Sequence, residues 1–170
     1  MSASSPPAKM SPGSKIVPIR AARPVRTLRP THTPRPGGQI AIGMTYELAI
    51  DSFFGASHSM RPNGERHTHS FRVQAAFVTD HIDENGMTVG FREVSDLLDY
   101  EARKYSNQYL NDLKPFRELQ STGENLAALV FHNVDWALQT EIPHGPKLVA
   151  VTLWENPTSY IKVSRTGRAA

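Results

Sequence analysis

Three histidines have the residue type and spacing that could bind a metal ion. His67 and His69 lie two residues apart in a predicted strand, and His58 precedes them by nine residues. Side chains at positions i and i+2 of a strand project from the same face, so both imidazoles point the same way. With His58 at the end of a preceding strand, the set would bind Zn²⁺ and leave a fourth position open, as catalytic zinc sites do. Seven histidines in 170 residues also make one His-x-His pair unremarkable, so an incidental pair is the alternative.

The composition limits the ligands and the setting of such a site. The chain has no cysteine, which excludes disulfides and thiolate ligands, so a metal would be held by histidine, carboxylates or water. A set of three histidines also accepts iron, cobalt or nickel. Hydrophobic residues make up 39% of the chain, and no apolar run approaches the roughly 20 residues that cross a bilayer. We therefore expect a cytoplasmic protein without a membrane segment.

The chain divides into three parts by composition. Residues 1–38 carry seven Lys and Arg residues, eight of the thirteen prolines and no acid, whereas residues 39–170 have a net charge of −4. Proline at this density disfavours helix, and little of this segment can be buried, so we expect residues 1–38 to be a disordered basic tail. Residues 39–164 would form one domain, and residues 165–170 a short C-terminal tail.

The basic tail allows two other interpretations. Its positive charge could bind nucleic acid or acidic lipid, and its Arg- and Ser-rich composition is similar to that of a transit peptide. A solvated extension is favoured over a transit peptide, because the prolines prevent the amphipathic helix that such peptides form. Salt-dependent nucleic-acid binding that disappears when residues 1–38 are deleted would support the first alternative.

Hydrophobic periodicity predicts four strands and two helices in the domain. Apolar patterning indicates strands at 39–54, 67–79, 147–155 and 159–164. Helical spacing indicates a helix at 91–105 and a second helix further along the chain. The second helix begins with a capping box from Ser121 to Glu124. The order β-β-α-α-β-β predicts an α+β fold, an antiparallel four-stranded sheet with both helices on one face. The other face would need a cover, such as another subunit.

Five motifs, in their order along the chain, resemble those of the 6-pyruvoyl-tetrahydropterin synthase / 6-carboxy-tetrahydropterin synthase family. The resemblance covers about residues 40–164, with the motifs Phe54-x-Ala56-x-His58, His67-x-His69-x-Phe71, Tyr109-Leu110-Asn111, Thr122-x-Glu124 and Glu155. It implies the tunnelling fold, whose element order is the one predicted above. It also implies trimers whose sheets join into a barrel, often stacked as hexamers, which would remove unpaired sheet edges.

The resemblance assigns roles to individual residues. His58, His67 and His69 match the three zinc ligands. Glu155 matches the carboxylate that anchors the pterin, and its two oxygens suit the amino and ring N–H groups of that heterocycle. Glu124 matches a glutamate of the family's site, but the capping box alone would also explain it. The implied substrate is 7,8-dihydroneopterin triphosphate or a related pterin, bound between subunits.

The residues that move protons in the family are replaced in this chain. The resemblance places a cysteine base at Asn63 and an Asp-His pair at Ser106 and Asn107. Asparagine and serine have no pKa near neutrality, so they cannot take a proton as a thiolate or imidazole does. Glu65 is the candidate replacement, because some members of the family use a glutamate near the cysteine position. A zinc-bound water is an alternative base, and Glu65 would then be an ordinary solvated loop acid.

Two functional hypotheses follow from these residues. The leading one is a zinc-dependent lyase similar to 6-carboxy-tetrahydropterin synthase, which would serve queuosine-type deazapurine synthesis if it follows the bacterial branch, or biopterin synthesis otherwise. The second is a catalytically inactive or repurposed member that keeps zinc and pterin binding. The joint replacement of three coupled catalytic groups favours the second. The presence of all three histidines and Glu155 favours the first.

Overall fold

The computed structural model of the chain describes residues 43–61 and 64–165. The predicted basic tail, residues 1–38, lies outside the described residues, as do the first residues of the strand predicted at 39–54. Asn63 and residues 166–170 of the predicted C-terminal tail also lie outside them.

A long antiparallel hairpin forms the centre of the sheet. β1 (Tyr46–His58) pairs with β2 (His67–Thr79) along its whole length. On its other side β2 pairs with β4 (Lys147–Asn156), which in turn pairs with β5 (Ser159–Ser164). The first strand therefore begins later than predicted and runs through His58, so this histidine belongs to the strand itself.

The sheet has five strands, and the prediction of four antiparallel strands is wrong in this respect. β3 (Gln108–Tyr109) runs parallel to β1, which gives the order β3-β1-β2-β4-β5. Asn107 has a φ of 59°, a left-handed conformation that asparagine tolerates, and its N–H donates to the carbonyl of Gly55 at 2.6 Å. This turn lays the next residues against β1. A strand of two residues is too short to give a periodicity signal.

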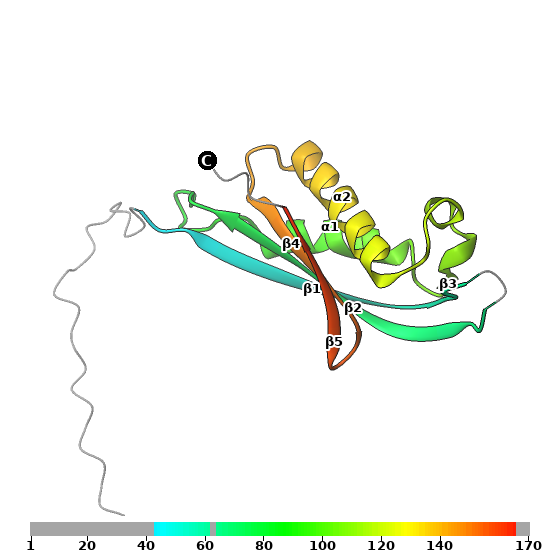
Figure 1. Cartoon of the computed structure of the whole chain (residues 1–170). Coiled ribbons are helices and arrows are strands. Elements are labelled where there is room, and N and C mark those ends of the chain that lie inside the picture. Colours follow the sequence, from blue (N-terminus) through cyan, green and yellow to red (C-terminus); the bar gives the residue numbers. More distant parts are fainter. Residues whose placement is uncertain (1–42, 62–63, 166–170) are drawn as a thin grey trace, which may run out of the picture. The chain divides into compact units, whose positions relative to one another are not determined.

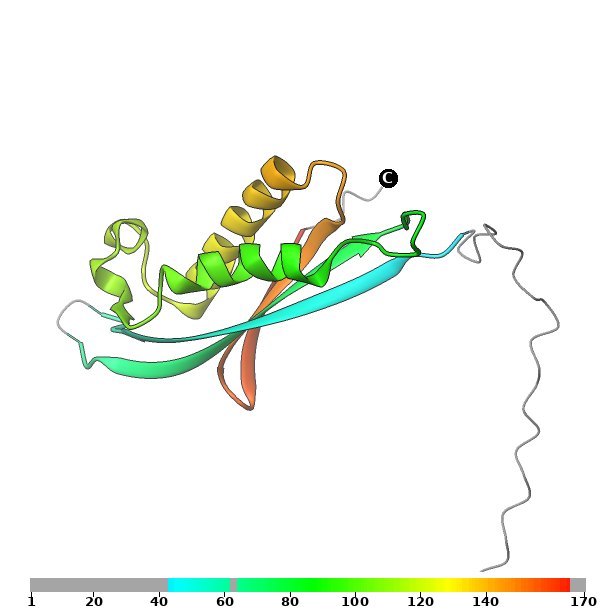
Figure 2. The same ribbon diagram turned by 180° about the vertical axis from the view of Figure 1, so that it is seen from behind.

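Both helices lie on the same side of the sheet, as predicted (Figures 1 and 2). α1 (Phe91–Arg103) and α2 (Gly123–Glu141) are joined through β3 and two short 3₁₀ helices, η1 (Leu110–Asp112) and η2 (Lys114–Arg117). Among the described residues, neither α-helix combines the length and the apolar character that a bilayer crossing requires.

The core lies between the helices and the covered face of the sheet. Inward residues alternate with outward ones along β2, so a slip of one residue would turn the apolar set to solvent and the register is strongly specified. Each large side chain in this layer contributes about 1.5–3 kcal/mol by its burial. The largest fully buried side chains are Phe71, Phe77, Leu98, Leu110, Leu126, Leu148 and Leu153.

Neither helix covers the opposite face of the sheet (Figure 1). A row of large side chains crosses this face. The ladders align Phe53, Arg72, Trp154 and Tyr160 across β1, β2, β4 and β5. The Arg72 guanidinium lies 4.4 Å from the centroid of the Trp154 ring. Phe53 is 69% exposed and Tyr160 60%. Aromatic surface of this kind on one side of a sheet is typical of a face that an assembly covers.

Candidate functional site

The three predicted metal ligands lie on one face of the β1–β2 hairpin. His58 pairs directly with His67, and Ala56 pairs with His69. Residues paired directly across an antiparallel ladder share a face, as do residues two apart in one strand. Phe54 and Phe71 form the next pair along and belong to the core, so all three imidazoles project from the helix-covered side.

The spacing of the rings fits a metal site only in part. The centroid of His58 lies 5.1 Å from that of His69 and 6.4 Å from that of His67. Zn–N bonds of about 2.0–2.1 Å and tetrahedral angles place two imidazoles of one site roughly 5 Å apart. His58 and His69 meet this spacing, whereas the exposed His67 lies further out. Within residues 43–61 and 64–165, no three histidine or acidic side chains are already arranged to hold a metal ion.

The chemistry of the donors nevertheless suits zinc, because His58 is held in a defined tautomer. Its buried ring makes a hydrogen bond through Nδ1 to the carbonyl of Ser121. A carbonyl oxygen only accepts, so Nδ1 carries a proton, and in the neutral ring Nε2 keeps its lone pair. A histidine that ligates a metal through one nitrogen commonly donates from the other to such a partner. A side-chain rotation of His67 would be needed to complete the set.

Asn111 fixes the residue that follows His58. Its side-chain oxygen accepts from the Ser59 N–H at 2.9 Å, and its side-chain nitrogen donates to the Ser59 carbonyl at 3.0 Å. The Ser121 hydroxyl donates to the same carbonyl at 3.2 Å. The Tyr109-Leu110-Asn111 motif therefore has a structural role beside the histidines. The sequence motif indicates no role for Asn111, because its partner is a peptide group 52 residues away.

The N-terminus of α2 differs from the predicted capping box. Thr122, not Ser121, is the N-cap, and its side chain accepts from the Asn125 N–H at 3.2 Å. Ser121 is instead directed at His58 and Ser59, through its carbonyl and its hydroxyl. Glu124 consequently sits in the first turn, exposed, and not at the third helical position that a capping box requires. The capping explanation of Glu124 was wrong, and its predicted role in the site stays a prediction.

Glu155 lies against the first residue of α2. It is half-buried near the end of β4, where the pairing with β5 is irregular between Trp154 and Asn156. A Cβ atom added to Gly123 would meet Glu155 Oε1 at 2.9 Å, so the carboxylate occupies the space that a side chain would fill. The N-terminal end of a helix favours a nearby negative charge. Thus Gly123 contacts Glu155, and Ser121, two residues earlier, contacts His58.

The positions of the expected proton relay hold no acid or base. Ser106 is half-buried and Asn107 is exposed, both in the turn that leads from α1 to β3. The Asn107 backbone is bound to Gly55, three residues before His58. Glu65 lies in the exposed segment just before β2, two residues from His67. The role of Glu65 as a base stays a prediction, which its exposed position neither supports nor contradicts.

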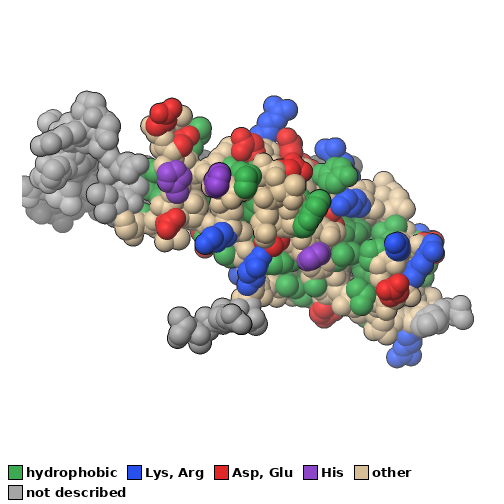
Figure 3. Space-filling view, turned by 90° about the horizontal axis from the view of Figure 1, so that it is seen from above, with side chains coloured by type: hydrophobic (Ala, Val, Ile, Leu, Met, Phe, Trp, Pro, Cys, Tyr) green, Lys and Arg blue, Asp and Glu red, His purple; other side chains and the backbone are tan. Residues whose placement is uncertain are grey.

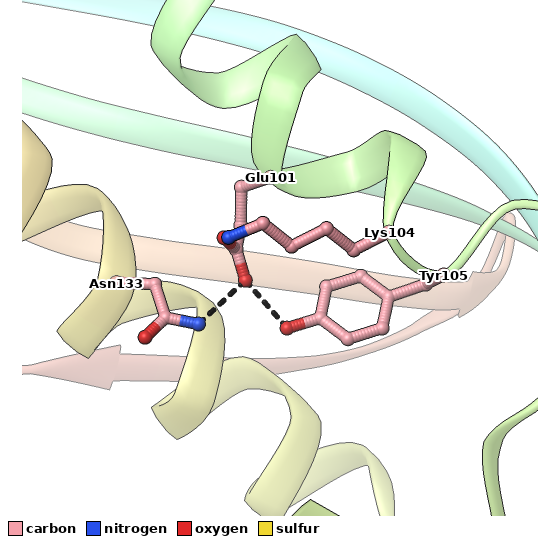
Figure 4. Close-up of polar contacts among 4 residues, drawn as sticks. All are labelled: Glu101, Lys104, Tyr105 and Asn133. Atoms are coloured by element: carbon pink, nitrogen blue, oxygen red, sulfur yellow. Dashed lines mark hydrogen bonds and ion pairs between the residues drawn. The ribbon is translucent and has the colours of Figure 1, made fainter. Parts of the chain in front are cut away.

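A buried polar cluster that sequence analysis did not single out joins the two helices. Glu101 is 2% exposed, and its carboxylate accepts from Tyr105 at 2.5 Å, Asn133 at 2.7 Å and Lys104 at 2.6 Å. Figure 4 shows these side chains converging on Glu101 from the end of α1 and from α2. Burial, then the hydrogen bond and charge of Glu101, raises the pKa of Tyr105. The sequence signal for this pair was the spacing of four residues between Glu101 and Tyr105 at the end of the predicted helix.

A large groove in the described part of the chain lies apart from the histidines. It has a volume of about 900 Å³ between α1 and α2 and is lined by Tyr100, Glu101, Lys104 and Trp136 among others, with none of the predicted site residues. Figure 3 shows acidic and large hydrophobic side chains close together on this helix-covered face. The groove therefore does not support a metal or pterin site.

Comparison with known proteins identifies relatives of the chain. Residues 47–166 match the family model described as 6-pyruvoyl tetrahydropterin synthase. The 6-carboxy-5,6,7,8-tetrahydropterin synthase of Bacillus subtilis (strain 168) is 29% identical over 125 residues, which cover 68% of this chain and 83% of the Bacillus protein.

Solved structures show the same fold at low sequence identity. The Caenorhabditis elegans 6-pyruvoyl tetrahydropterin synthase superposes with a TM-score of 0.63 at 16% identity, covering 72% of this chain and 97% of that one. A Plasmodium vivax 6-pyruvoyltetrahydropterin synthase, in a variant that lacks a catalytic glutamate, gives a TM-score of 0.57 at 13% identity. That match covers 72% of this chain and 98% of the other.

Proposed function

Since the chain belongs to the 6-pyruvoyl tetrahydropterin synthase family, we propose that it is a zinc-dependent lyase that acts on 7,8-dihydroneopterin triphosphate or a related pterin. The proposed activity is similar to that of 6-carboxy-tetrahydropterin synthase, the name that the Bacillus relative carries. One observation carries it: three histidines share a face of the β1–β2 hairpin, and a single short segment, residues 121–123, contacts both His58 and Glu155.

Each residue of the proposed site has a distinct task. His58, His67 and His69 would hold the zinc ion, which when bound supplies Lewis-acid polarisation of the oxygens on the substrate side chain. Glu155 would accept two hydrogen bonds from the amino and ring N–H groups of the pterin and so orient the ring. Glu124, exposed in the same first turn of α2, would contribute to the same pocket.

Glu65 is the proposed base that removes a proton from the substrate side chain. It lies in the exposed segment that leads into His67, where a side chain can move toward a bound ligand. The Plasmodium vivax enzyme has a catalytic glutamate, so a carboxylate is an established catalytic group in this fold. A carboxylate base must lie within hydrogen-bond reach of the proton that it abstracts.

The active form would be a trimer or hexamer. The uncovered aromatic row that includes Phe53 and Tyr160 supports this assembly, since joined sheets would shield it. β5 is an edge strand, and pairing between copies would satisfy its free backbone groups. A cytoplasmic location and a role in queuosine-type synthesis belong to the same proposal.

A second candidate function is a zinc- and pterin-binding protein without turnover. The turn at Ser106 and Asn107 favours it, because its backbone is hydrogen-bonded to Gly55 of β1 and neither side chain can transfer a proton near pH 7.

The decisive assay adds dihydroneopterin triphosphate to purified, zinc-loaded protein and follows the release of inorganic triphosphate. We expect release by the wild type, and its loss in Glu65→Gln. The matched control is Glu84→Gln, another exposed loop acid, which should release triphosphate at the wild-type rate. Pterin binding without release would favour the second function. The absence of both pterin binding and triphosphate release would contradict both proposed functions.

A further inference from the structure

We propose that Gly123 is a positioning residue, which sets the place of the Glu155 carboxylate relative to His58 by having no side chain. The inference rests on the proposed function, because it concerns the pterin-binding end of the same site. It adds a residue for which the sequence motifs gave no role.

Gly123 is required for space and not for its backbone conformation. It is the buried first residue of α2, and the glycines of positive φ in the described part of the chain are Gly43 and Gly86. A Cβ atom at position 123 would lie 2.6 Å from Ile161 Cδ1 and 2.9 Å from Glu155 Oε1. Contacts this short do not persist, so both neighbouring groups would have to move.

The groups that would move are the ends of flexible side chains. Ile161 is half-buried on β5, and its Cδ1 can turn away through a change of rotamer. Glu155 can likewise swing its carboxylate. A substitution of Gly123 by alanine should therefore leave the helix and the sheet in place while displacing the carboxylate. Alanine is also the better helix former, which offsets part of the cost of repacking.

The displacement matters because the same segment holds the other half of the site. The Ser121 carbonyl accepts from His58 Nδ1, and the Ser121 hydroxyl donates to the Ser59 carbonyl. Residues 121–123 thus form a short bridge between the first histidine and the proposed anchor. A ligand that must reach both ends is sensitive to a shift of about 1 Å in one of them.

The test measures binding of neopterin, a fluorescent pterin, by the full-length zinc-loaded wild type, Gly123→Ala, Glu155→Gln and Gly90→Ala. Gly90 is the matched control: it stands at the N-terminus of α1, and a Cβ there would have its nearest contacts at an ordinary 3.5 Å. We expect Gly123→Ala to raise the Kd at least tenfold, with zinc content and circular dichroism unchanged, and Gly90→Ala to bind as the wild type does.

The double variant Gly123→Ala with Ile161→Val separates repacking from positioning. Valine has no Cδ1 and so removes the 2.6 Å contact, but the contact with Glu155 persists. We expect this variant to fold even if the single variant does not, and still to bind neopterin weakly. Wild-type affinity in either folded variant, with Glu155→Gln impaired, would overturn the role of Gly123. Equal binding by the wild type and Glu155→Gln, or none by the wild type, would instead count against the proposed function.

Discussion

Asn111 shows how a side chain outside the proposed ligand set can determine the site. It makes two hydrogen bonds to the peptide groups of Ser59, the residue next to His58. The backbone of β1 is therefore fixed at the point where the first histidine projects. Neither bond depends on the metal, so Asn111 would orient His58 in the metal-free protein as well.

Asn111→Ala should weaken both the fold and the metal site. It leaves a partly buried N–H and carbonyl of Ser59 without that partner, so we predict a loss of about 1–3 kcal/mol in the free energy of unfolding. Zinc affinity should fall about 10–100-fold, as it does when groups that support metal ligands are removed. Urea unfolding and competition with a chelator measure the two effects. Asn85→Ala, in an exposed turn, is the control and should change neither. Unchanged zinc affinity in Asn111→Ala would show that His58 needs no such support.

Tyr105 makes the free energy of unfolding decrease as the pH rises into the alkaline range. Burial is the largest cause that raises its pKa above the ordinary 10.0, and the hydrogen bond to Glu101 adds to it. Above pH 10 the unfolded chain loses the tyrosine proton while the folded chain keeps it. The unfolded state then binds fewer protons, so the free energy of unfolding falls as pH rises.

Comparison with Tyr105→Phe isolates this contribution. At pH 9 the variant should be less stable by about 1–2 kcal/mol, because Glu101 loses one of its donors. Between pH 10 and 11 the difference should shrink by up to about 1.4 kcal/mol, since only the wild type carries this proton. Urea unfolding at pH 9, 10 and 11 gives the three values. A constant difference across this range would mean that Tyr105 titrates normally in the folded state.

At the scale of elements, the start of α2 is where the local sequence signal and the tertiary structure disagree. Both Ser121 and Thr122 are good N-cap residues, and the spacing to Glu124 favoured Ser121. The contacts of Ser121 with His58 and Ser59 use its side chain and carbonyl, so the helix begins one residue later. Contacts across more than 60 residues are not encoded in a local pattern.

Thr122→Ala tests the observed cap. The Asn125 N–H loses its acceptor, so we predict a decrease of about 1 kcal/mol in the free energy of unfolding. Thr122→Ser keeps the hydroxyl and should be close to the wild type. Thermal or urea unfolding distinguishes the two. An unchanged free energy of unfolding in Thr122→Ala would contradict the observed cap.

Long periodic segments were predictable and short or irregular ones were not. The bounds of β2 and β5 are as predicted, because their alternation is regular and turn residues flank them. β3 was missed, since its two residues form a strand only through the turn at Asn107. The shared face of His67 and His69 followed from strand periodicity, whereas that of His58 did not, because the predicted strand ended at residue 54. The approach of Glu155 to Gly123 did not, because it depends on how β4 and α2 pack.

At the scale of the whole molecule, the sheet determines what the protein can assemble with. One face is covered by α1 and α2 (Figure 1). The other face presents the aromatic row from Phe53 to Tyr160. A trimer or hexamer would cover this face without any contribution from the basic tail.

Deletion of residues 1–38 should therefore leave the oligomeric state unchanged. Sedimentation velocity at matched protein concentrations compares the full chain with the truncated one, and we predict a trimer or hexamer for both. Phe53→Glu in the full chain is the converse variant, because a charge in the aromatic row should weaken the assembly. A monomer after truncation would show that the tail takes part in assembly.

The most direct measurement is X-ray absorption at the zinc edge of the full-length, zinc-loaded protein. Three imidazole nitrogens at about 2.0–2.1 Å and one oxygen ligand are the predicted shell. In His67→Ala the metal should be lost or bound by fewer imidazoles. A zinc ion surrounded by oxygens alone, or one whose shell is the same in His67→Ala, would contradict the metal site on which the proposed function rests.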